Sequence, residues 1–191
     1  MKIYEISELM SKLEEMGYGN VDISDILHKL EMDTVSVITG TDVLENYIGT
    51  TEYNGIVAKI QKWYYGRLVK APWCATCASW VLDQLKKNGV SMLDTLKCKD
   101  ENVYNMYKKL LQSKTEVNGD IKRGDIIILC FDNKFNTTAS KHVTFAYKDT
   151  PSTSKTVSCL GGNQCDKICV KDYNRSNIVG IFRPDYSGYT L

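Results

Sequence analysis

The chain has 191 residues, of which 43% are hydrophobic and 25% are charged, so it is long enough to bury one full hydrophobic core. Its 24 Lys and Arg residues nearly balance 23 Asp and Glu residues, and a net charge of +1 argues against broad binding to nucleic acid or to an anionic membrane surface. No stretch approaches the roughly 18 consecutive apolar residues of a membrane span. The charged N-terminus indicates synthesis in a cytoplasm without a signal peptide.

Apolar residues at helical spacing dominate the first half of the chain. Two short helices are predicted within residues 6–16 and 23–30, and they belong to an N-terminal helical extension over residues 1–41. Further helices are expected after Asp42 and across residues 56–66, where Gly66 supplies a stop. Residues 42–191 contain no linker that would separate two large domains, so one domain is predicted there.

The clearest helix follows Pro72. Its apolar positions recur every three or four residues from Cys74 to Leu85, and Gly89 supplies a stop. Another helix is indicated over residues 103–111. Beyond it the pattern becomes β-like, with short strands predicted at residues 126–131, 142–147, 156–160, 167–170 and 178–182. Helices first and strands later, without βαβ alternation, predict an α+β domain with helices on one face of an antiparallel sheet of about five strands.

Two histidines occur in the chain, and most hydrolytic mechanisms need a base that titrates near neutral pH. His28 falls in the N-terminal extension and is interpreted as a surface or packing residue. His142 begins an alternating strand, with Thr144 and Ala146 on its own face and Val143 on the other. The other face has a core pattern, so His142 is expected on a side available to a cleft. A lone histidine is otherwise more often structural.

Cys74 is the candidate nucleophile. Pro72 fits the first helical turn and places this thiol near the helix N-terminus, where unpaired amides and the positive dipole end favour the thiolate. Lowering a thiol pKa by two units takes about 2.7 kcal/mol, which a helix terminus and an imidazolium together can supply. From the helix alone, a packed core residue like Cys77 is an equally good interpretation.

Seven cysteines occur in the chain, an odd number that favours free thiols in the absence of a secretory signal. A zinc site built from Cys159, Cys165 and Cys169 is disfavoured because their spacing matches no compact ligand pair. We therefore expect neither a metal nor another cofactor.

Asn163 is the candidate orienting residue. It lies 21 residues after His142, within Gly-Gly-Asn-Gln at residues 161–164. An amide at this place can accept the imidazole N–H and hold the ring in one tautomer, whereas a simple turn is the alternative. The order of thiol, histidine and amide along the chain predicts a catalytic site of Cys74, His142 and Asn163.

These motifs together resemble the CHAP group of cysteine- and histidine-dependent amidohydrolases and peptidases, in particular its phage-associated members. The likeness runs from about Asp42 to Pro184. The motifs that carry it are Pro72-Trp73-Cys74-Ala75, Ser79-Trp80-Val81, Arg123-Gly124-Asp125-Ile126-Ile127, Lys141-His142-Val143 and Leu160-Gly161-Gly162-Asn163-Gln164.

The resemblance implies a papain-like fold that hydrolyses an amide bond of bacterial peptidoglycan. By position, Cys74 is the nucleophile, His142 the general base and acid, and Asn163 the orienting residue. The activity implied is that of an N-acetylmuramoyl-L-alanine amidase or a stem or cross-bridge endopeptidase, in a phage or prophage lytic enzyme that reaches the wall after release. By analogy with NlpC-related enzymes, the candidates for the oxyanion hole and substrate groove are Tyr65, Tyr64, Trp73 and Gln164.

A thioredoxin-like oxidoreductase is the competing interpretation, because Cys74 and Cys77 could cycle between dithiol and disulfide. That arrangement needs a buried strand directly before the motif, but residues 63–70 are polar and interrupted by Gly66. It also leaves His142 without a function. Hydrolysis is therefore the preferred prediction, with a Cys74–Cys77 disulfide as an inactivating switch. A catalytically silent wall-binding module is the third class of function.

Overall fold

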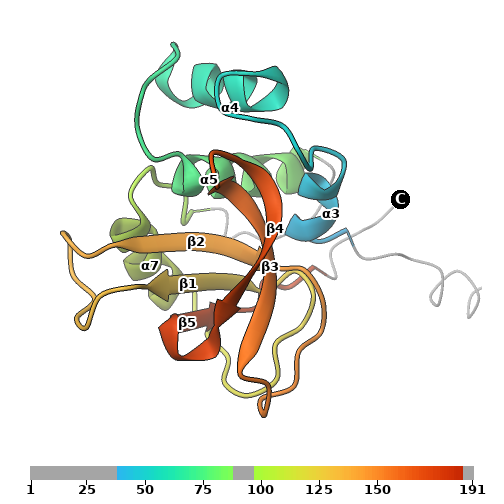
Figure 1. Cartoon of the computed structure of the whole chain (residues 1–191), viewed down its shortest axis with the longest axis vertical. Coiled ribbons are helices and arrows are strands. Elements are labelled where there is room, and N and C mark those ends of the chain that lie inside the picture. Colours follow the sequence, from blue (N-terminus) through green and yellow to red (C-terminus); the bar gives the residue numbers. More distant parts are fainter. Residues whose placement is uncertain (1–37, 88–96, 187–191) are drawn as a thin grey trace, which may run out of the picture. The chain divides into compact units, whose positions relative to one another are not determined.

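The computed structural model describes residues 38–87 and 97–186. The helices predicted in residues 1–37, His28 and Gly89 lie outside this part of the chain. Four helices come first within it (Figure 1): α3 (Gly40–Glu45), α4 (Gly55–Tyr65), α5 (Cys74–Lys87) and α7 (Val103–Gln112). The later elements are β1 (Ile126–Cys130), β2 (Lys141–Ala146), β3 (Thr156–Gln164), β4 (Lys167–Asn174), the 3₁₀ turn η1 (Arg175–Asn177) and β5 (Ile178–Phe182).

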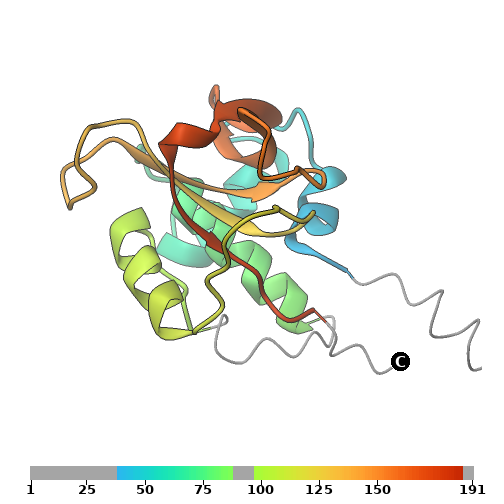
Figure 2. The same ribbon diagram turned by 90° about the horizontal axis from the view of Figure 1, so that it is seen from below.

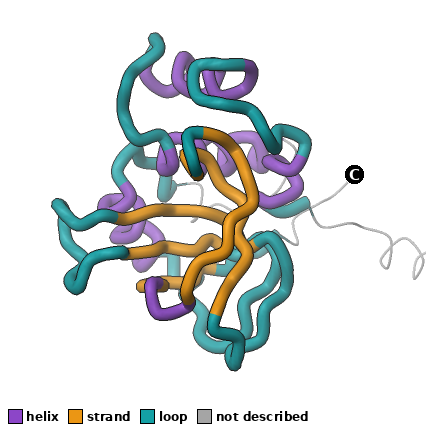
Figure 3. The backbone as a smooth tube through the Cα atoms, viewed as in Figure 1, coloured by secondary structure: helices purple, strands orange, loops and turns teal. Residues whose placement is uncertain are grey.

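The five strands form one sheet in the order β4-β3-β2-β1-β5, and every neighbouring pair is antiparallel. Strands β1 to β4 follow the chain as a meander, and β5 returns to pair with β1. The four α-helices precede the five strands in the chain, and only the short η1 interrupts the strands, between β4 and β5 (Figure 3). The predicted α+β class with an antiparallel sheet of five strands is therefore confirmed.

Helix α5 is the central helix of the layer that covers the sheet. It packs on β2 and β3, with α3 and α7 contacting the same sheet beside it and α4 contacting α5 from outside. Figure 2 shows α5 and α7 on the same side of β1 and β2.

None of the helices in residues 38–87 and 97–186 is both long and apolar enough to cross a bilayer.

Both sides of β2 are buried, because the sheet has a hydrophobic cluster on each face. Val143 and Phe145 pack with α5 in one cluster, whereas Ala146 joins a second cluster with Ile127 and Tyr173. Successive residues of a strand point to opposite faces, so the alternation expected for this strand is present. The prediction of an open face was wrong, because the side of β2 that carries the histidine is a second core.

Residues near each terminus determine where α4 ends and where α5 begins. Helix α4 ends at Gly66, whose left-handed φ of 71° suits glycine and whose N–H donates to the Lys62 carbonyl. Helix α5 begins after Trp73, whose carbonyl accepts the Cys77 N–H at 2.8 Å. Pro72 thus precedes the helix and does not belong to its first turn, but Cys74 is the first helical residue, as expected.

Candidate active site

Cys74 lies at the start of α5 and lines a surface pocket of ≈ 580 Å³. Its side chain is mostly covered, because only 6% of the residue is exposed. The pocket is formed by the end of α4, the segment before α5, the segment before α7 and the start of β2. Its other lining residues are Tyr65, Val69, Ala71, Pro72, Glu101, Asn102, Val103, Ala139, Ser140 and Lys141.

Burial decides the protonation state of this thiol. It raises the pKa of Cys74, while the backbone N–H groups of Val143, Ala75 and Cys74 and the positive charge of Lys141 act in the opposite direction. Desolvation penalises the charged form more strongly than these amides favour it. The helix-start amides act in the expected direction, but burial outweighs them, and the pKa of Cys74 lies above its ordinary value.

The Cys74 thiol lies against strand β2. It accepts a hydrogen bond from the backbone N–H of Val143, the residue that follows His142. The imidazole lies on the side of β2 that carries Thr144, and in the described residues no hydrogen bond joins it to the Cys74 sulfur. The Cys74 thiol therefore contacts the backbone next to His142, but the thiol and the imidazole are not hydrogen-bonded to each other in this state.

Gln164 orients the imidazole. The Oε1 atom of Gln164 lies 3.1 Å from Nε2 of His142 and also accepts from Thr144 Oγ1 at 3.0 Å and from Tyr173 OH at 3.2 Å. Its Nε2 donates to the carbonyl groups of Cys159 and Cys169, which identifies the two ends of the amide. Because an amide oxygen only accepts, Nε2 of the histidine carries the proton and Nδ1 is left as the basic nitrogen.

The imidazole is held as a neutral base. Burial lowers the pKa of His142 to about 4, the hydrogen bond to Gln164 acts in the opposite direction, and the positive charge of Lys171 adds to the lowering. The ring of Tyr173 packs beside it, with centroids 5.8 Å apart and planes at 39°. These two shifts disfavour a resting thiolate–imidazolium pair, so proton transfer from Cys74 to His142 requires a change in the surroundings of both groups.

The residue that contacts His142 is Gln164 and not Asn163, which corrects the expected triad. Gly161 lies next to Thr144, so strict alternation along β3 would bring Asn163 to this same face. However, the β3–β4 pairing shifts between Gly161 and Gln164, and Asn163 adopts a left-handed φ of 61°. This irregularity moves the side-chain alternation by one residue. Asn tolerates such a φ better than most residues, which is the one sequence signal for the shift.

The β3–β4 turn completes this geometry. Cys165 and Asp166 both have positive φ values, of 54° and 57°, and connect Gln164 to its partner Lys167. A two-residue turn with this backbone matches the twist of a hairpin. The tight turn and the bulge before it therefore determine which amide side chain points toward His142.

The other predicted site residues have different positions. Tyr65 lines the pocket, and its hydroxyl lies 3.0 Å from Thr76 Oγ1. Tyr64 is half-buried and packs its ring against Tyr65, at a centroid distance of 5.0 Å, outside the pocket lining. Trp73 is fully buried and Gln164 is 1% exposed. Neither residue therefore lines a substrate groove, although both were predicted to do so.

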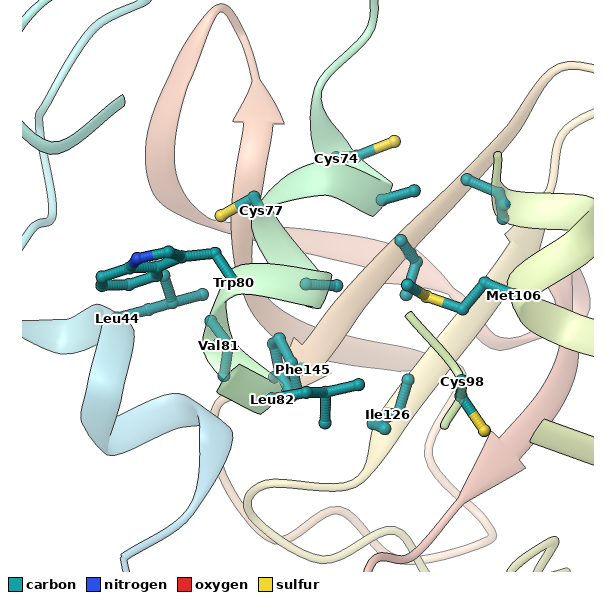
Figure 4. Close-up of a cluster of buried hydrophobic side chains, with 14 of the residues drawn as sticks. Leu44, Cys74, Cys77, Trp80, Val81, Leu82, Cys98, Met106, Ile126 and Phe145 are labelled. Carbon is teal, nitrogen blue, oxygen red and sulfur yellow. The ribbon is translucent and has the colours of Figure 1, made fainter. Parts of the chain in front are cut away.

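Cys77 belongs to the core. It is 1% exposed and lies under Gly162 of β3, where a Cβ atom would come within 2.6 Å of its sulfur. Burial raises its pKa to about 12. Figure 4 shows the sulfur atoms of Cys74 and Cys77 pointing to different sides of the first turns of α5. The interpretation of Cys77 as a packed residue is consistent with this position.

Comparison of the chain with protein-family models, with curated proteins and with solved structures finds no match. In residues 38–87 and 97–186 no three His, Cys, Asp or Glu side chains are grouped as metal ligands would be.

Proposed function

We propose that this chain is a cysteine-dependent amide hydrolase that acts on bacterial peptidoglycan. The observation that carries the proposal is the contact between His142 and Gln164, which leaves Nδ1 basic on a strand that touches a helix-start thiol in a pocket. The CHAP resemblance supplies the substrate class, a papain-like arrangement and the role of a phage or prophage lytic enzyme. The antiparallel α+β architecture is compatible with it.

The proposed reaction starts from the neutral pair. His142 Nδ1 takes the thiol proton as Cys74 Sγ attacks the amide carbonyl, which requires the two side chains to meet when substrate is bound. Gln164 keeps the Nε2 proton in place throughout. The imidazolium then protonates the leaving amine, and water, activated by the same nitrogen, hydrolyses the thioester.

Two groups would stabilise the tetrahedral oxyanion in this scheme. The backbone N–H of Cys74 is one donor, since it lies in the first turn of a helix, where N–H groups have no intrahelical acceptor, and Cys74 lines the pocket. The hydroxyl of Tyr65 lines the same pocket and is the second donor, provided that it exchanges its hydrogen bond with the Glu101 side chain for one with the oxyanion. The bond that is cut is then the muramoyl-L-alanine amide or an amide in the stem or cross-bridge.

The redox alternative has less support. The residues that lead to Cys74 form α4 and a loop, whereas a redox Cys-x-x-Cys motif is typical of a βαβ pattern. The sulfur atoms of Cys74 and Cys77 also point apart (Figure 4). The experiment below therefore also measures reduction of a disulfide substrate, which is the result that the redox alternative predicts.

The experiment compares wild type with Cys74→Ala, His142→Ala and Cys77→Ala on purified peptidoglycan, with released fragments identified by mass spectrometry. Cys77→Ala is the matched control, since it removes a sulfur from the same helix. Hydrolysis predicts that the first two variants lose activity and that Cys77→Ala retains most of it. Insulin reduction that needs both cysteines, without release of wall fragments, would instead establish the oxidoreductase.

A further inference from the structure

The pocket beside Cys74 contains two charged residues that come from separate segments, Glu101 before α7 and Lys141 at the start of β2. We propose that this pocket binds a short peptide with a free carboxylate and a free ammonium close to the scissile amide. Lys141 would bind the carboxylate and Glu101 the ammonium. This inference rests on the proposed function and specifies the substrate class of the same site.

The ammonium group of Lys141 is fixed at the pocket wall by two hydrogen bonds to backbone carbonyl groups. Its Nζ donates to the carbonyl oxygens of Thr137 at 2.9 Å and Ala139 at 2.6 Å. An ammonium has three hydrogens, so one remains for a ligand. No described carboxylate forms an ion pair with this lysine. Its charge acts on the Cys74 thiol, so a carboxylate bound here lies near the reacting sulfur.

Glu101 is an exposed carboxylate without a described ion pair. Its neighbour Asp100 is different, because Lys109 Nζ lies 2.9 Å from that carboxylate. The Tyr65 hydroxyl forms a hydrogen bond with the Glu101 side chain and lines the same pocket. Because a carboxylate has two acceptor oxygens, Glu101 can also accept from an ammonium group at the pocket.

The two charges do not neutralise each other, since no ion pair joins Glu101 to Lys141 in the described residues. A ligand with one charge would leave the other without a partner, whereas a zwitterionic peptide engages both. Much of the remaining wall is aliphatic and suits small apolar side chains of such a peptide: Val69, Ala71, Pro72, Val103 and Ala139.

The test measures binding to the full chain carrying Cys74→Ala, so that turnover cannot interfere. The probes are four forms of trialanine: both ends free, the C-terminus amidated, the N-terminus acetylated, and both ends blocked. Isothermal titration and NMR titration give the dissociation constants. Each free end is expected to tighten binding by about tenfold, as hydrogen bonds to charged groups do.

The variants assign each end to one residue. Lys141→Met should abolish the preference for a free carboxylate and leave the preference for a free ammonium, and Glu101→Gln should do the reverse. The matched controls are Lys134→Met, in the loop that precedes β2 and outside the pocket lining, and Glu116→Gln, which is paired with β5 through its backbone. Equal weakening of all four peptides by both variants, or no effect of blocking either end, would overturn the inference.

Failure of this inference is separable from failure of the proposed function. Selective binding of free trialanine without any Cys74-dependent cleavage of peptidoglycan would remove the hydrolase and keep the zwitterion site. Cys74-dependent cleavage with binding that ignores both charges would do the opposite.

Discussion

The Oε1 atom of Gln164 lies 3.1 Å from Nε2 of His142, and this contact determines which nitrogen of the imidazole is basic. The same oxygen accepts from Thr144 and Tyr173. Three donors on an acceptor with two lone pairs make Gln164 the centre of a buried network. The orientation of the histidine is therefore a property of β3 and β4 together and not of β2 alone.

Replacing Gln164 should remove activity and stability together. Gln164→Ala leaves buried donors and acceptors without partners, so we expect the free energy of unfolding to fall by about 3 kcal/mol. Loss of the imidazole orientation should lower kcat/KM on peptidoglycan by about 100-fold or more. Urea unfolding and wall hydrolysis, corrected for the folded fraction, measure the two effects.

Asn163→Gly is the matched control for that variant, since glycine accepts the positive φ of this position without strain. It should retain nearly wild-type kcat/KM. If Asn163→Gly loses as much activity as Gln164→Ala, the amide of Asn163 has a role that the observed contacts do not provide.

Stability should fall as the pH decreases below about 6.5, the unfolded-state pKa of a histidine. Burial lowers the folded-state pKa of His142 to about 4, so between these two values the unfolded chain binds more protons than the folded chain. The loss is complete near pH 4 and amounts to roughly 3 kcal/mol at most.

Urea unfolding of wild type and His142→Gln at pH 7, 6 and 5 isolates this contribution, because carboxylate titrations are common to both chains. A parallel fall in the two proteins would contradict the assignment. NMR offers a direct measurement, since the chain has two histidines, and His28→Gln leaves a single imidazole to titrate.

Gly162 allows β3 to approach α5. A Cβ atom at this position would lie 2.6 Å from Cys77 Sγ and would also collide with the Trp73 ring. Gly162→Ala should therefore destabilise the fold by about 1–3 kcal/mol, the usual cost of overpacking a core. Thermal or urea unfolding measures the change.

The double variant Gly162→Ala/Cys77→Ala tests whether the sulfur is responsible. Removing the sulfur should recover part of the stability, so the two changes should be non-additive. An unchanged midpoint for Gly162→Ala alone would show that the helix and strand separate easily at this contact.

The sequence predicted the elements well because their signals are local. The apolar stripe from Cys74 to Leu85 identified α5, and the β-like runs identified all five strands, since helical and strand periods differ. Strands β3 and β4 extend to Gln164 and Asn174, beyond the predicted residues 160 and 170. Their later residues include glycines and charged side chains, so pairing between strands and not hydrophobic pattern defines these ends.

Site prediction was less complete, for reasons that concern particular residues. The sequence placed Cys74 at a helix start and His142 near a strand start, and both positions are as expected. It chose Asn163 as the amide of the Gly-Gly-Asn-Gln segment that follows the thiol and the histidine in the chain, whereas a shift in strand pairing brings the next amide, Gln164, to the imidazole. It also assigned Trp73 to a groove, although a large aromatic ring is as easily a core residue, and here it is fully buried.

The amino-acid sequence by itself determined the order of helices and strands, the residue that begins α5 and the start of β2 to within one residue, because these depend on periodicity and on turn residues nearby in the chain. Only the tertiary structure decided that Gln164 holds the imidazole and that Cys74 rests as a neutral thiol. The first depends on a shift in strand pairing, and the second on how much water the packed elements exclude. The strand pairing and the burial of the thiol both depend on residues that are distant in the sequence, so no local sequence pattern predicts them.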